Sequence, residues 1–135
     1  MDAIAPLGDV NYWAVLVAAV VGFAIGGAWY SPMLFAKPWM RLSGSEPQAG
    51  ESPVGPLAVA FVSALVAVFV LALFVGRDAG VGVGALAGLL AGLGLGGTGF
   101  AMNYAFEKRP LGLLAINAGY WTVMLTVAGA ILGAW

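Results

Sequence analysis

The chain has 135 residues, of which 62% are hydrophobic and only 8% are charged, and its mean hydropathy is +1.01. These values exclude a soluble globular domain of ordinary composition and are typical of an integral membrane protein. The net charge of -1 excludes a nucleic-acid-binding surface, and the chain contains neither cysteine nor histidine.

Four apolar runs follow one another along the chain, each close to or above the ~20 residues that cross the hydrocarbon of a bilayer. They are residues 10–30, 57–76, 81–103 and 111–135. None of them contains a charged residue, so all four are predicted to span the membrane as helices. The first run is expected to be a retained anchor, since residues 1–9 carry no basic side chain. The predicted fold class is therefore all-α, with one transmembrane domain covering residues 1–135.

The connection between the first two spans has two parts of different composition. Residues 31–42 mix aromatic and basic side chains, which is typical of a segment at the level of the lipid headgroups. The side chains predicted to lie there are Phe35, Lys37, Trp39 and Arg41. Residues 43–56 contain three prolines and three glycines, so they are predicted to form a flexible linker.

The third run contains five glycines at intervals of four residues. They are Gly80, Gly84, Gly88, Gly92 and Gly96. Because four residues advance a helix by about 400°, the glycines form a groove without side chains along about 24 Å of helix. Small residues let membrane helices approach closely, so this glycine ladder predicts a helix-packing surface, either within one chain or between chains.

Short connections predict that the spans form two helical hairpins. Residues 77–79 make the second and third spans antiparallel neighbours, so the ladder is expected to face the small residues of the second span. Those residues are Ala60, Ser63, Ala64 and Ala67. Residues 104–110 predict a hairpin between the third and fourth spans, and Gly22 and Gly26 give the first span a small-residue face of its own.

The basic residues predict an orientation. Four of the five, Lys37, Arg41, Lys108 and Arg109, fall in the first and third connections, while Arg77 alone falls on the opposite side. Since cytoplasmic connections are enriched in Lys and Arg, both chain ends are predicted to lie outside the cytoplasm.

Polar residues at membrane depth indicate a candidate site near the basic side. Asn103 and Glu107 are four residues apart on one helix face, and Asn117 lies about six residues into the fourth span, at a similar depth. The predicted cluster is Trp29, Tyr30, Asn103, Glu107, Asn117 and Tyr120. Two interpretations remain: a polar pocket open to the cytoplasm, or an Asn103–Asn117 hydrogen bond with Glu107 paired to a basic residue.

Several motifs in these segments are recognisable. They are WYSP at residues 29–32, NYAFE at residues 103–107 and INAGY at residues 116–120. Together with Phe35, Lys37 and Trp39, they resemble a family of small bacterial membrane proteins known as domain of unknown function 1761, over residues 11–135. The resemblance implies four spans and a bacterial inner-membrane location, and it implies no established activity, substrate or cofactor.

The sequence favours a non-enzymatic function. It contains no metal-binding cluster of carboxylates and no phosphate-binding glycine loop, so no metal or cofactor is expected. A lipid, quinone or pigment bound by shape alone remains open. The first hypothesis is a helix-packing module that forms a homo-oligomer or serves as an accessory subunit of a larger membrane complex. The alternative is a small permease or channel for a neutral or weakly polar solute.

Overall fold

The computed structural model describes residues 4–45 and 50–135, and every regular element in them is helical. The elements are η1 (Leu7–Asp9), α1 (Tyr12–Trp29), α2 (Ala36–Ser43), α3 (Val54–Phe74), α4 (Val81–Ala91), η2 (Gly92–Gly97), α5 (Thr98–Glu107) and α6 (Leu111–Ala134). Four helical stretches are long and apolar enough to span a membrane: α1, α3, α6 and the continuous run Val81–Glu107. The prediction of an all-α chain with four candidate spans is confirmed.

Local sequence explains where the helices begin and end. The Asn11 side chain accepts a hydrogen bond from the Ala14 backbone N–H and caps α1. Helix α3 begins at Val54, inside the predicted linker, because Pro56 falls in the first turn, where a missing N–H costs little. Residues 46–49 of that linker and residues 1–3 lie outside the described part. Lys108, in the left-handed region at φ 56°, ends the third span.

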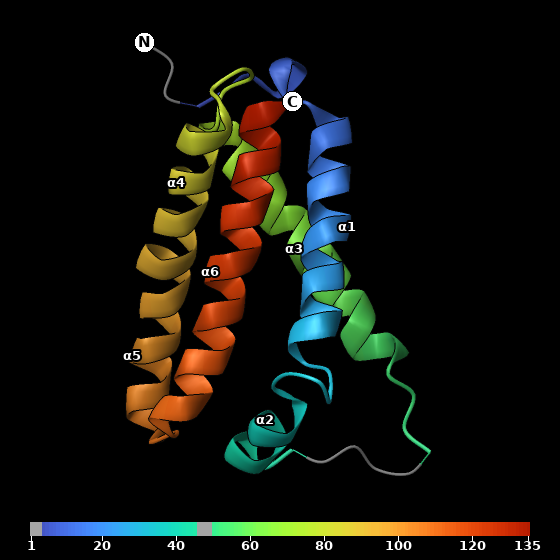
Figure 1. The fold of residues 1–135 in the computed structure, drawn as a ribbon, viewed down its shortest axis with the longest axis vertical. Coiled ribbons are helices and arrows are strands. Elements are labelled where there is room, and N and C mark those ends of the chain that lie inside the picture. Colours follow the sequence, from blue (N-terminus) through green and yellow to red (C-terminus); the bar gives the residue numbers. More distant parts are fainter. Residues whose placement is uncertain (1–3, 46–49) are drawn as a thin grey trace.

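The spanning helices form an open bundle in which α6 contacts each of the other three (Figure 1). Helices α4, α6 and α1 are seen side by side, and α3 crosses behind them at an angle. The connection between α3 and α4 lies at the same end of the bundle as the end of α6, whereas α2 and the α5–α6 connection lie at the opposite end. The four basic residues of the first and third connections therefore share one end of the molecule.

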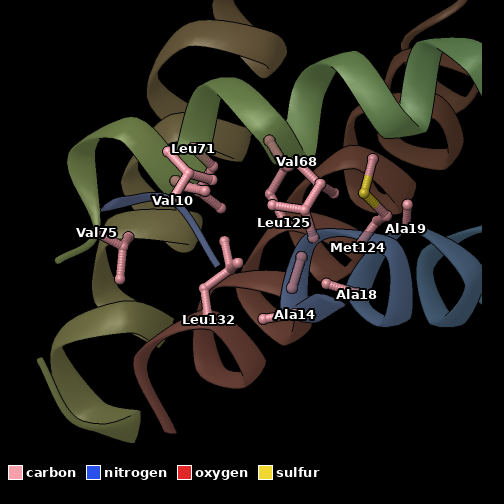
Figure 2. Packing of buried hydrophobic residues seen from close by; sticks show 13 residues of the cluster. Val10, Ala14, Ala18, Ala19, Val68, Leu71, Val75, Met124, Leu125 and Leu132 are labelled. Atoms are coloured by element: carbon pink, nitrogen blue, oxygen red, sulfur yellow. The ribbon is translucent and has the colours of Figure 1, made fainter. Parts of the chain in front are cut away.

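Small side chains allow the core helices to pack closely around α6 (Figure 2). Ala14, Ala18 and Ala19 of α1 are fully buried, and Val68 of α3 meets them with Met124 of α6. Arg77 joins the N-terminal segment to the same end of the core, since its Nε donates to the Asp9 carbonyl at 2.6 Å. The core thus unites α1, α3 and α6, with α4 packed on the outside of α6.

The prediction that the glycine ladder packs against the second span, α3, is wrong, because α4 packs along α6 and has few contacts with α3. Val75 is extended, and the connection that follows takes positive φ values at Asp78 (61°) and Gly80 (98°). This connection turns the chain away from α3. The Gly80 N–H then donates to the Gly133 carbonyl at 2.9 Å, which holds the start of α4 against the end of α6.

Helices α4 and α6 meet backbone to backbone. A Cβ built on Gly84 would overlap the Gly129 carbonyl, and one built on Gly88 would overlap the Leu125 carbonyl. A Cβ on Gly92 would lie 2.7 Å from the Thr122 Cα. Any side chain at these three positions would therefore force the helices apart.

The ladder changes register after Gly92, where the chain forms the π-helical segment η2. A π turn contains an extra residue, so the next glycine to face α6 is Gly97, which is buried beside Ala118. Gly96 is only half-buried, and its nearest neighbour, the Trp121 Cβ, would lie 3.7 Å from an added Cβ. Beyond Gly92 the backbones are no longer in contact.

Candidate functional site

The polar residues of the bundle gather at the end where α1, α5 and α6 meet. The Tyr30 hydroxyl donates to Asn117 Oδ1 at 2.7 Å, and Asn117 Nδ2 donates to the Tyr104 hydroxyl oxygen at 2.7 Å. We call Tyr30, Asn117 and Tyr104 the tyrosine–asparagine bridge. It links the residue after α1 to α5 through a side chain of α6.

Two further hydrogen bonds join α1 to α6 beside this bridge. The Tyr120 hydroxyl donates to the Gly22 carbonyl at 2.9 Å, and Trp29 Nε1 donates to the Ile116 carbonyl at 2.9 Å. Glycines make room for both rings, since a Cβ on Gly26 would lie 3.0 Å from the Tyr120 hydroxyl oxygen and one on Gly119 would lie 3.1 Å from the Trp29 ring. The predicted packing residues Gly22 and Gly26 therefore lie against side chains of α6.

Aromatic contacts attach the first connection and α2 to this end of the bundle. The ring centroids of Trp29 and Phe35 are 4.9 Å apart, and those of Tyr30 and Trp39 are 6.1 Å apart. Lys37 and Arg41 are exposed. Of the residues predicted at the headgroup level, the two aromatic ones thus contact the bundle and the two basic ones face outward. Their depth in a membrane stays a prediction.

The predicted Asn103–Asn117 hydrogen bond is wrong. The Asn117 amide is bonded to the two tyrosines of the bridge, and Asn103 is exposed. The extra residue of η2 explains the error, because one residue turns a helix face by about 100° and so brings Tyr104 toward α6 in place of Asn103.

The predicted pairing of Glu107 with a basic residue is present, but outside the bridge. Arg109 Nε lies 3.0 Å from Glu107 Oε1, and both side chains are exposed. The Arg109 guanidinium also lies 5.9 Å from the centre of the Tyr104 ring, an arrangement that favours cation–π attraction. Tyr104 is the bridge residue missing from the predicted cluster. The sequence feature that coincides with this change of face is the glycine-rich run Gly92–Gly97, where the π-helical segment forms.

The arrangement has the chemistry of a structural clamp. The Asn117 amide oxygen and nitrogen are both used within the chain, and the bridge contains no carboxylate, imidazole or amine. In the described residues no three His, Cys, Asp or Glu side chains lie close enough together to hold a metal ion. The bridge therefore supports an interhelical hydrogen-bond function better than proton transfer.

A crevice of about 230 Å³ opens beside the bridge, between α3 and α6. It is lined by Tyr30, Ala60, Ser63, Ala64, Tyr120, Trp121 and Met124. The structure gives the Ser63 hydroxyl no hydrogen-bond partner within residues 4–45 and 50–135. The hydroxyls of Thr98, Thr122 and Thr126, by contrast, each donate to a carbonyl of their own helix.

These features define a polytopic membrane protein with four helical spans, held at one end by hydrogen bonds between its helices. The chain belongs to the family described as protein of unknown function (DUF1761), whose model matches residues 13–133. No curated protein and no solved structure matches it. The resemblance in the sequence motifs is thus confirmed at the level of the family.

Proposed function

We propose that this protein is a non-enzymatic helix-packing subunit that binds a further transmembrane helix along α3. The helix would come from a second copy of the chain or from a larger membrane complex. The observation that carries the proposal is Ser63, an exposed hydroxyl near the middle of a spanning helix without a partner in the described residues.

A lone hydroxyl in hydrocarbon is unfavourable, because lipid tails offer no hydrogen-bond partner. Ala60 stands about one turn before Ser63 and Ala67 about one turn after it, and Ala60 is exposed because α4 packs elsewhere. Small residues around a hydroxyl are typical of helix contacts in membranes. This α3 face, defined by the exposed residues Ala60 and Ser63, supports docking of one more helix.

The alternative, a small permease, has less support. The crevice beside α3 reaches Tyr30 and Tyr120, which would be polar groups along a path for a solute. Both hydroxyls already donate to groups within the chain, so neither is free to bind a solute as a donor.

We expect Ser63→Leu to weaken the association by about tenfold or more, since a bulky side chain holds helices apart and removes the hydroxyl. Native mass in nanodiscs and the yield of co-purified protein would measure it. Val62→Leu is the matched control, because Val62 is exposed on another face of α3.

Cysteine cross-linking gives a second measurement, since the chain has no cysteine of its own. Under mild oxidation Ala60→Cys should form disulfide-linked dimers in the membrane, if the docked helix belongs to a second copy, and Val62→Cys should not. A monomer without partners whose mass is the same with and without Ser63→Leu would contradict the proposal.

We also propose a bacterial inner-membrane location with both chain ends outside the cytoplasm. The proposal is supported by the basic residues, four of which belong to the connections at the α2 end of the bundle. Alkaline phosphatase fused after Trp135 should be active in cells, because it would lie outside the cytoplasm. A green fluorescent protein fused at the same place should remain dark, because it would be exported in an unfolded state. A fluorescent fusion together with an inactive phosphatase fusion would show the opposite orientation and contradict the proposal.

A further inference from the structure

We propose that a groove between the third span and α6 binds one acyl chain of an anionic phospholipid. The groove has a volume of about 670 Å³, and Leu93, Leu114 and Val123 form its apolar walls. The proposal is independent of the α3 face, which none of the groove residues shares.

The chemistry of the lining selects an apolar occupant. The two hydroxyls in the groove are already bonded within their own helices, Thr98 to the Gly94 carbonyl at 2.7 Å and Thr122 to the Ala118 carbonyl at 2.7 Å. Trp29 also lines the groove, and its indole N–H is bonded to the Ile116 carbonyl. Every polar side-chain group in the groove is therefore already satisfied, and only van der Waals contact remains for a ligand.

The π-helical segment opens the groove. Up to Gly92 the third span and α6 are in backbone contact, whereas a Cβ on Gly97, the next glycine that faces α6, would lie 3.8 Å from the Ala118 side chain. At Gly97 the nearest atom to an added Cβ is a side-chain carbon of Leu93 at 3.6 Å. The extra residue of η2 thus ends the close packing and leaves a channel beside small residues.

The length and depth of the groove match one leaflet of a bilayer. From Leu93 to Ala101 the lining covers about 12 Å of helix, and half of a ~30 Å hydrocarbon core is about 15 Å. Gly94 lies at the midpoint of the span Val81–Glu107. The groove therefore runs from the bilayer centre toward the α5–α6 connection, which carries Lys108 and Arg109.

The charges at that end favour an anionic headgroup. Lys108 is exposed at the end of α5, and α2 brings Lys37 and Arg41, also exposed, to the same end of the bundle. Each basic residue near a headgroup favours an anionic over a zwitterionic lipid by about fivefold. A lipid with its chain in the groove would place its phosphate at the level of Lys108.

Quenching of Trp29 fluorescence tests the proposal, because Trp29 lines the groove. The full chain, with its other four tryptophans replaced by phenylalanine, is reconstituted in phosphatidylcholine nanodiscs containing phosphatidylglycerol with brominated acyl chains. Quenching should saturate at a low fraction of the brominated lipid, and at least about fivefold more should be needed when brominated phosphatidylcholine is used instead. Lys108→Asn should reduce this preference by about fivefold, and asparagine is chosen because it tolerates the left-handed backbone conformation of position 108.

Gly94→Leu should fill the groove and abolish the saturable quenching. Gly99→Leu is the matched control, since a Cβ there, like one on Gly94, meets no atom within 4 Å and Gly99 does not line the groove. Native mass spectrometry gives a second measurement, made on the original chain and on each of the two variants in the background that keeps all its tryptophans. Only the Gly94→Leu variant should lose retained phosphatidylglycerol. Equal quenching by both lipids, equal lipid retention in the two variants, or loss of a bound protein with Gly94→Leu would overturn the proposal.

Discussion

Gly88→Ala is expected to lower the free energy of unfolding by about 3 kcal/mol, the upper end of the range for overpacking a tight contact. The added methyl group would overlap the Leu125 carbonyl and lie 2.9 Å from the Thr126 Cα. These are backbone atoms, so no side-chain rotation relieves the clash and α4 must move away from α6. Reversible unfolding in mixed micelles, followed by circular dichroism, would measure the loss.

Gly82→Ala is the matched control for this prediction. Gly82 lies in the same helix, and a Cβ built on it meets no atom within 4 Å. Alanine also favours the helix over glycine by about 1 kcal/mol, so this variant should be as stable as the original protein or slightly more so. Equal losses at the two positions would remove the α4–α6 contact as the explanation.

Asn117→Ala is expected to lower the free energy of unfolding by about 2 kcal/mol, since it removes both hydrogen bonds of the tyrosine–asparagine bridge. Tyr30→Phe and Tyr104→Phe should each cost about half as much, because each removes one bond. The same unfolding assay would measure all three variants.

Two comparisons sharpen the test of the bridge. Asn103→Ala should change stability little, since Asn103 is exposed. In a Tyr30→Phe background, Asn117→Ala should cost less than in the original chain, because one of its bonds is already missing. Purely additive losses would show that the bridge does not couple α1 to α6. Loss of partner binding with unchanged stability would favour a binding site over a clamp.

Hydropathy and length predicted the four spans, because hydrocarbon demands long apolar helices whose backbone groups are bonded internally. The same reasoning located the polar end of the bundle, where Trp29, Tyr30, Asn117 and Tyr120 do form hydrogen bonds between helices. These features depend on composition and depth along each helix, which can be counted in the sequence.

Only the tertiary structure decided which helices of the chain pack against one another. Small-residue faces on α3 and α6 are chemically alike, so the sequence alone does not choose between Ala64 and Gly129 as the neighbour of the glycine ladder. The backbone turn at Asp78 and Gly80 decides for α6. Likewise, the π-helical segment η2 turns Tyr104 toward α6 in place of Asn103. The spans follow from the apolar solvent, whereas helix pairing and rotation depend on turn geometry and on one extra residue, which no hydropathy pattern records.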